Sequence, residues 1–130
     1  MRLQVFNVSS CRIKDIMLKH VLAANINTSV GTAIKLMQNA QVAILPVLSG
    51  SRLAGIVTRE QLEKEVQTKR LGDVRLELVF VTEDDTIEKA AKLMVENSLA
   101  RLPVVSEASS MHCVGIITST EIAKYHKEKC

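Results

Sequence analysis

The chain contains a second copy of part of itself, and this duplication limits the possible folds more than any other feature. Residues 28–48 align with residues 85–105 at an offset of 57, and 8 of the 21 aligned pairs are identical. Further along the offset becomes 60, where "GIVTREQL" at 55–62 matches "GIITSTEI" at 115–122. Such self-similarity indicates two like structural units that share a core. We expect three segments along the chain: an N-terminal arm at 1–12, a first repeat at 13–70 and a second repeat at 71–130.

Each repeat predicts the same order of elements: a strand, a helix, two strands and a second helix. Apolar residues at i, i+3, i+4 and i+7 start at Val30 and again at Ile87, which is the spacing of an amphipathic helix. The second of these helices should open with a capping box between Asp85 and Glu88. Short apolar runs predict strands at 22–26 and 77–81, 42–48 and 101–105, and 53–58 and 113–118. Final helices should cover 59 to about 68 and 119 to about 129.

The size of one repeat predicts how the two copies pack. A unit of about 57 residues with one thin sheet is hardly stable alone, so the two sheets should pack face to face about a pseudo-twofold axis. The predicted fold is therefore α+β (α/β in the broader sense), a tandem of two β-α-β-β-α units with two equivalent clefts. Pro46 and Pro103 lack an N–H, and each should lie at a sheet edge or a strand end.

Composition narrows the class of protein and its location. Aromatic residues make up 2% of the chain, and the formal net charge is +3 without a dense basic run. The core should therefore be aliphatic, and nucleic-acid binding, which favours clustered cations and stacking aromatics, is not indicated. Cys11, Cys113 and Cys130 are odd in number and widely spaced, which is typical of free thiols in a reducing compartment. Residues 1–20 hold no signal-peptide run, and no segment has the ~20 apolar residues of a membrane span, so we expect a cytoplasmic protein.

No motif in the sequence points to catalysis or to a metal. His20, His112 and His126 lie in different predicted elements, and none has a Cys or Ser signature beside it. A catalytic nucleophile needs a base within reach. Cys113 and His112 are adjacent, but nothing nearby completes the four ligands of a zinc site. We expect no catalytic residue, no metal and no cofactor, and therefore no enzymatic activity.

The two matching turns around Thr58 and Thr118 allow two interpretations. Thr58 with Gln61, and Thr118 with Glu121, fit the capping box S/T-x-x-E/Q, which would simply start two helices. The same geometry presents free amides, a positive dipole end and a hydroxyl, and these favour a phosphate. Nearby Arg59 and Arg101 could add charge-assisted contacts. The two roles are compatible, and the residues leave both open.

The order of motifs resembles the CBS (cystathionine β-synthase) domain. In each half a start such as "IKDIM" at 13–17 or "LGDVR" at 71–75 is followed by a strand, an "AxxxM" helix, an "hPVh" strand and a "GhhT" turn. The tandem resembles a Bateman module, a CBS pair, over about residues 13–128. This resemblance implies binding of an adenosine compound such as AMP, ADP, ATP or S-adenosylmethionine in clefts between the two domains, a form of energy sensing.

The resemblance also implies roles for particular residues. The family's Thr contacts phosphate or ribose, its Asp three residues later grips the ribose hydroxyls, and residues around the Pro hold adenine. Thr58 and Thr118 match that Thr, whereas Gln61 and Glu121 stand where the family has Asp. Glu121 keeps the charge that Gln61 lacks, which favours the second site, with Thr118, Ser119 and Arg101. The implied ligand-binding set has six members in each half: Ile44, Leu45, Pro46, Thr58, Arg59 and Gln61, and Arg101, Leu102, Pro103, Thr118, Ser119 and Glu121.

The sequence thus predicts a non-catalytic regulatory module that binds an adenosine-containing ligand. Its output would pass to an effector protein, and the resemblance implies a homodimer. One alternative is a ligand-free structural or dimerisation module whose two turns only cap helices. Another is a nucleic-acid-binding module that uses Arg59, Arg101 and the basic stretch at 124–129.

Overall fold

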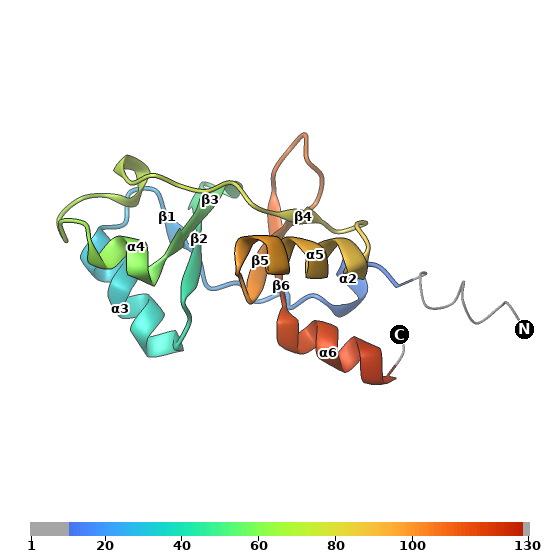
Figure 1. Cartoon of the computed structure of the whole chain (residues 1–130). Helices are drawn as coiled ribbons and strands as arrows, with labels where there is room; N and C mark the ends of the chain where they lie inside the picture. Colours follow the sequence, from blue (N-terminus) through green and yellow to red (C-terminus); the bar gives the residue numbers. More distant parts are fainter. Residues whose placement is uncertain (1–10, 129–130) are drawn as a thin grey trace, which may run out of the picture. The chain divides into compact units, whose positions relative to one another are not determined.

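The structure is a computed structural model that describes residues 11–128, with side chains as far as Tyr125. It is an α+β fold with two three-stranded sheets (Figure 1). The chain divides into two compact units: residues 22–79 form one, and residues 11–21 together with 80–128 form the described part of the other. The predicted arm lies outside the described residues except for Cys11 and Arg12.

The first-repeat unit, residues 22–79, has the predicted order of strands and helices. Its sheet has the order β1-β2-β3, in which β1 runs parallel to β2, and β2 and β3 form an antiparallel hairpin. Two helices, α3 and α4, accompany the sheet (Figure 1). The elements are β1 (Ala24–Asn25), α3 (Val30–Ala40), β2 (Ile44–Ser49), β3 (Arg52–Thr58), α4 (Arg59–Glu63) and the 3-10 turn η1 (Leu71–Asp73).

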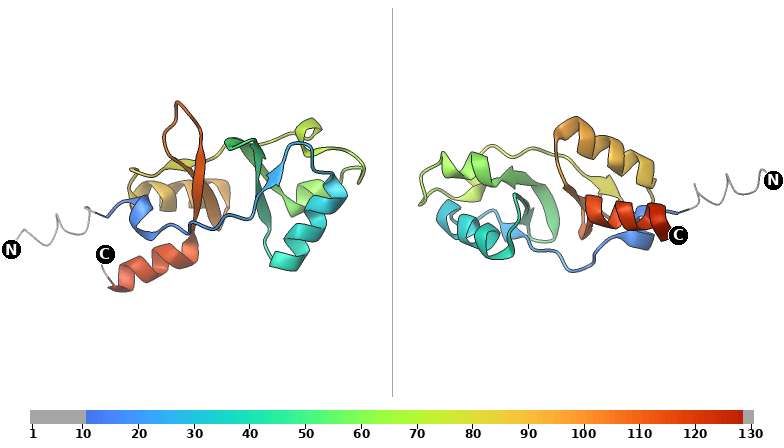
Figure 2. Two further views of the ribbon diagram at one scale, coloured as in Figure 1. Left: turned by 180° about the vertical axis from the view of Figure 1, so that it is seen from behind. Right: turned by 60° about the horizontal axis from the view of Figure 1, so that its bottom comes forward.

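The second-repeat unit has the same plan, with one additional helical turn from the chain's start. Its sheet has the order β4-β5-β6 with the same pairing directions. Helix α2 lies next to α6, as Figure 2 shows from two further sides. The elements are α2 (Ile13–Ile16), β4 (Val81–Thr82), α5 (Ile87–Asn97), β5 (Arg101–Val105), β6 (Cys113–Thr118) and α6 (Ser119–Glu128). The order β-α-β-β-α is therefore confirmed in both repeats.

Both long helices begin and end in the same way. Ser29 caps α3 and Thr86 caps α5, each accepting a hydrogen bond from the backbone N–H three residues on, at 3.2 Å. The predicted capping box between Asp85 and Glu88 is wrong, because the Asp85 carboxylate instead accepts the Thr82 N–H at 2.8 Å. That carboxylate stabilises the turn before the helix and leaves the cap to the hydroxyl of Thr86.

Three predicted elements are shorter than expected. The strand predicted at 22–26 contracts to β1, Ala24–Asn25. Helix α4 ends at Glu63 rather than near residue 68. The chain beyond it turns back so that the carbonyls of Lys69 and Gln67 accept the N–H groups of Val30 and Gly31, at 2.8 and 3.0 Å. These are first-turn donors of α3 that have no partner within their own helix. The predicted strand at 77–81 contracts to β4, which begins only at Val81.

Both cores are aliphatic, as the composition predicts. Met37 and Met94 occupy equivalent positions on α3 and α5, and both are buried. Around them lie buried Val, Ile, Leu and Ala side chains from the strands and the flanking helices. Burial of such side chains contributes roughly 1.5–3 kcal/mol each and is the main stabilising term in each unit.

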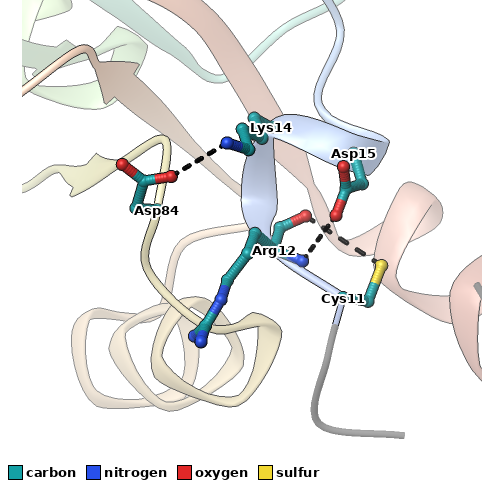
Figure 3. A network of polar contacts seen from close by, with 5 residues as sticks. All are labelled: Cys11, Arg12, Lys14, Asp15 and Asp84. Carbon is teal, nitrogen blue, oxygen red and sulfur yellow. Dashed lines mark hydrogen bonds and ion pairs between the residues drawn. The ribbon is translucent and has the colours of Figure 1, made fainter. Parts of the chain in front are cut away.

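The start of each repeat docks on the turn before the long helix of the other repeat. Ile13 N–H donates to the carbonyl of Asp85 at 3.1 Å, and its counterpart Leu71 donates to that of Thr28 at 2.9 Å. An ion pair between Lys14 and Asp84 at 3.2 Å adds to the first of these contacts, and the Asp15 carboxylate accepts the Arg12 N–H at 2.8 Å (Figure 3). This exchange explains why the compact units do not follow the sequence repeats.

The segments that start the two repeats, residues 13–18 and 70–79, are called the arms from here on, and they extend both sheets. Leu18 pairs with Ile116 on β6, and Glu77 pairs with Ile56 on β3, as antiparallel bridges. Gly115 and Gly55 precede these strand residues, and a Cβ on Gly115 would lie 2.7 Å from the Leu18 carbonyl oxygen. A Cβ on Gly55 would lie 2.9 Å from the Glu77 carbonyl oxygen. The glycine of the repeated motif is therefore required by the close approach of the arm.

Candidate functional site

The two predicted turns are built alike. Thr58 ends β3 opposite Ile44, and Thr118 ends β6 opposite Arg101. Residues directly opposite in an antiparallel pair project from the same face of the sheet, with Cβ atoms about 4.5–5.5 Å apart. Arg101 and Thr118 are thus brought together, and Thr118 is the buried polar residue of the described chain, at 6% exposure.

Both threonines cap the helices that follow them. Thr58 Oγ1 accepts the Gln61 N–H, and Thr118 Oγ1 accepts the Glu121 N–H, each at 3.1 Å. This half of each predicted capping box is confirmed. The other half is wrong, because the side chains of Gln61 and Glu121 turn elsewhere. The Gln61 amide donates to the backbone carbonyl of Arg75, and the Glu121 carboxylate lies 3.7 Å from Lys124 Nζ.

The strand residues of the predicted site alternate between two faces. Leu45 and Leu102 are fully buried and belong to the aliphatic cores. Pro46 and Pro103 lie opposite Ile56 and Ile116 in the hairpins. Their predicted place at an edge or strand end is wrong, because β2 and β5 are the central strands of their sheets. Each proline is tolerated there because the parallel neighbour pairs only with the two strand residues that follow it.

A pocket of about 400 Å³ lies within the second-repeat unit, where the arm meets α6. One wall is the arm, with the apolar side chains of Ile16, Met17 and Leu18, and the other is the first two turns of α6. Its volume falls in the range of small-molecule sites, roughly 300–1,000 Å³. The lining residues are Asp15, Ile16, Met17, Leu18, Glu121, Lys124 and Tyr125.

The sequence prediction included only Glu121 among these residues. Lys124 and Tyr125 follow it by three and four positions and therefore share its face of the helix. That spacing in the sequence could have predicted that Lys124 and Tyr125 belong to the same site as Glu121. The arm residues carried no such signal, because nothing local connects Ile16–Leu18 with a helix that starts a hundred residues later. The pocket combines an apolar wall with a carboxylate, an ammonium and a phenol.

Arg59 and Ser119 line different pockets from Glu121. Arg59 borders a groove of about 420 Å³ with Gln38, Gln41, Val42 and Ala43. Its guanidinium lies 3.4 Å from Glu63. Ser119 borders the equivalent groove of about 470 Å³ in the second repeat, which is mostly apolar. The lining residues there are Ala91, Met94, Val95, Ser98, Leu99, Ala100, Ser119 and Ile122.

The cysteines differ from the prediction of three free thiols. Cys11 is disulfide-bonded, so that prediction is wrong for it, because sequence spacing does not show which sulfurs meet in space. Its Sγ also lies 4.0 Å from the Arg12 carbonyl oxygen (Figure 3). Cys113 is a free thiol. Burial raises its pKa, an effect partly opposed by the contact of its Sγ with the Gly115 carbonyl at 3.9 Å, so the thiol is protonated near neutral pH.

Within residues 11–128, no group of three or more His, Cys, Asp or Glu side chains could hold a metal ion. No helix in that range is long and apolar enough to cross a membrane.

Comparison with known proteins agrees with this architecture. The family model of the CBS domain matches residues 13–68 and 71–128, and the chain therefore belongs to the CBS domain family, as a tandem pair. The resemblance predicted from the sequence is confirmed. The fold class is confirmed too, because the structural neighbours are CBS domain pairs.

Three of these similar proteins are informative. Inosine-5'-monophosphate dehydrogenase of Methanocaldococcus jannaschii is 33% identical over 128 residues, which cover 95% of this chain but 25% of that enzyme. The crystal structure of CBSX2 in complex with AMP has 26% identity and a TM-score of 0.76, covering 90% of this chain and 96% of that one. The CBS pair of protein MJ0100, in complex with 5-methylthioadenosine and S-adenosyl-L-methionine, has 25% identity and a TM-score of 0.74, covering 92% and 98%. The chain thus spans about a quarter of the length of the curated dehydrogenase.

Proposed function

We propose that this chain is a regulatory CBS pair that binds an adenosine-containing ligand through its second repeat. The observation that carries the proposal is the pocket between the arm and α6, where an acidic side chain faces an apolar wall. The proposal also draws on CBSX2, whose structure contains AMP, and on the MJ0100 pair, whose structure contains 5-methylthioadenosine and S-adenosyl-L-methionine. A nucleoside has the matching chemistry, an aromatic base with apolar faces beside a diol that donates hydrogen bonds.

Each residue has a role in the proposed complex. Glu121 accepts hydrogen bonds from the ribose hydroxyls, and charge-assisted bonds of this kind are stronger than neutral ones. Lys124 and Arg101 supply positive charge for a phosphate or carboxylate on the ligand. Thr118 caps α6 and thereby positions Glu121, and the arm residues 16–18 form the apolar wall. In the first repeat Thr58, Arg59, Gln61 and residues 44–46 occupy the matching positions.

The module would act as a sensor rather than as an enzyme. A ligand that contacts the arm and α6 together stabilises the docked arm, and a difference in affinity between two states shifts their populations. Residues 16–18 lead directly into residues 22–79, so a change in arm docking reaches the other repeat along the chain. The output would pass to an effector protein. Adenosine compounds are intracellular metabolites, and we place the module in the cytoplasm on that ground.

We further propose a homodimer formed through the apolar groove of α5 and α6. Val95, one of its lining residues, is 81% exposed, an unusual state for a large aliphatic side chain in a groove that is also lined by Met94, Leu99 and Ile122. The matching groove of the first repeat has Gln38 in place of Val95. Val95→Glu should convert the dimer to a monomer in light scattering, whereas Gln38→Glu, its matched control, should not.

Thermal unfolding with AMP, ADP, ATP, S-adenosylmethionine and 5′-methylthioadenosine tests the ligand. A compound at 100 times its Kd stabilises the folded state by about 2.7 kcal/mol, which should raise Tm by several degrees. The shift should disappear in Glu121→Ala and persist in Glu96→Ala, a control on the exposed side of α5. No shift with any compound at millimolar concentration would refute the proposal.

A ligand-free assembly module is the second candidate, and one observation favours it. Thr118 is already occupied as a helix cap, and the Glu121 carboxylate already has Lys124 nearby. In that case Glu121→Ala would change neither the nucleotide response nor the oligomeric state.

A further inference from the structure

The two repeats differ at the position three residues after the capping threonine, and the difference changes what this side chain can do. Gln61 and Glu121 are equivalent at the offset of 60 that relates Ile56 to Ile116. A glutamine amide can donate hydrogen bonds, whereas an ionised glutamate can only accept them. Backbone carbonyls near either side chain can therefore be bound by Gln61 and not by Glu121.

The arm supplies such a carbonyl in each repeat. Leu18 and Glu77 are the arm residues bridged to Ile116 and Ile56, and Ile16 and Arg75 lie two positions before them. In the first repeat the Gln61 Nε2 group donates to the carbonyl of Arg75. In the second repeat Ile16 and Glu121 are both on the wall of the 400 Å³ pocket. An amide binds the arm in one repeat, and a carboxylate faces open volume in the other.

The remaining helix residues also differ. Lys124 and Tyr125 lie within α6, but their counterparts Lys64 and Glu65 come after the end of α4 at Glu63. Glu65 is held by Lys69, with Nζ and Oε1 3.1 Å apart. The first repeat therefore has neither the cation nor the aromatic hydroxyl on a helix face toward its arm.

We propose that the Gln61–Arg75 hydrogen bond closes the first repeat's counterpart of the pocket, so that each chain binds one ligand, on the second repeat. This inference rests on the proposed function for its ligand. One part of the inference requires no ligand: Gln61 holds the arm of residues 70–79 against α4.

Exchanging the two side chains tests the inference. The probe is 5′-methylthioadenosine, which carries no net charge, so an added carboxylate does not change binding through long-range repulsion. Calorimetric titration should give one site per chain in the wild type and two in Gln61→Glu. Glu121→Gln should weaken binding at least about tenfold, and the double exchange should restore a single site. Two sites in the wild type, or one unchanged site in Gln61→Glu, would overturn the proposal.

A second readout separates failure of this inference from failure of the proposed function. The Glu77 N–H, bonded to the Ile56 carbonyl at 3.2 Å, reports arm docking by hydrogen exchange. Loss of one neutral hydrogen bond should speed its exchange about fivefold in Gln61→Glu. Gln38→Glu makes the same chemical change on α3 and should leave that rate unchanged. If the probe binds none of the proteins, the proposed function fails, and an unchanged Glu77 rate in Gln61→Glu would refute the closing bond by itself.

Discussion

Replacing Gly115 with alanine should undock the arm from β6, because the new methyl group would occupy space already filled by the arm. The added Cβ would lie 2.7 Å from the Leu18 carbonyl oxygen and 2.9 Å from the Met17 sulfur. The thioether could move aside, but the carbonyl belongs to the backbone that forms the bridge. The φ of Gly115 is not positive, so alanine meets crowding alone and no left-handed strain.

The loss of unfolding free energy follows from the hydrogen bonds that this crowding would break. Leu18 N–H donates to the Ile116 carbonyl at 2.8 Å, and Ile116 N–H donates to the Leu18 carbonyl at 2.9 Å. Two backbone hydrogen bonds contribute about 2 kcal/mol together. Alanine in place of glycine restricts the unfolded chain and returns about 0.4–1 kcal/mol. The net loss is about 1–2 kcal/mol, which lowers Tm by roughly 4–10 °C in a chain of this size.

Urea unfolding of Gly115→Ala and of the wild type measures this loss of unfolding free energy. Hydrogen exchange of the Ile116 amide shows whether the loss occurs where the arm meets β6. Gly31→Ala is the matched control, because a Cβ there would meet Gln67 at 3.4 Å, an ordinary contact, within helix α3. Alanine should leave that helix unchanged or stabilise it by up to about 1 kcal/mol. A Gly115→Ala protein as stable as the wild type, with unchanged Ile116 exchange, would refute the argument.

Three further predictions follow from other contacts. Thr118→Val should lose about 1 kcal/mol of unfolding free energy, because the Glu121 N–H loses its cap, and Thr118→Ser should recover most of it. Gln41→Gly and Ser98→Gly should each stabilise the chain by up to about 1 kcal/mol in urea unfolding, since both residues end helices with positive φ, 56° and 55°. Because burial raises the pKa of the Cys113 thiol above its ordinary 9.0, its alkylation by iodoacetamide should be slow at neutral pH, and the rate should reach half of its maximum only above pH 9.0. A midpoint below that value would contradict the last of these.

The elements that the sequence predicted well are those set by local patterns. Helices α3 and α5 follow from their apolar spacing, and the two hairpins follow from runs of β-branched residues beside the repeated glycine. Thr58 and Thr118 were predicted as caps because a hydroxyl three residues before an N–H is a local geometry. Asp85 was misassigned because Thr86 beside it offers the same chemistry one residue later.

The arms could not be predicted, because their partners are distant in the sequence. Leu18 pairs with a residue on β6, and Glu77 pairs with one on β3, yet neither arm has the alternating pattern of a strand. The repeated glycines were the one sequence feature that these contacts require. Only the structure shows that an arm passes close to each glycine. Ile16, Met17 and Leu18 were missed in the candidate site for the same reason.

The arms also explain how one duplicated sequence can hold two unequal sites. Each arm must dock for its sheet to be complete, and both docking bridges are present. What differs is the side chain that faces the docked arm from the following helix. The amide of Gln61 donates a hydrogen bond to the carbonyl of the arm, so it is satisfied without a ligand. A carboxylate at position 121 cannot accept from a carbonyl, so its remaining lone pairs are satisfied by water, by Lys124 or by hydroxyl groups of a bound molecule. A nitrogen in place of one oxygen at this position thus gives the side chain a structural contact with the arm, while the cap, the strand and the glycine stay the same.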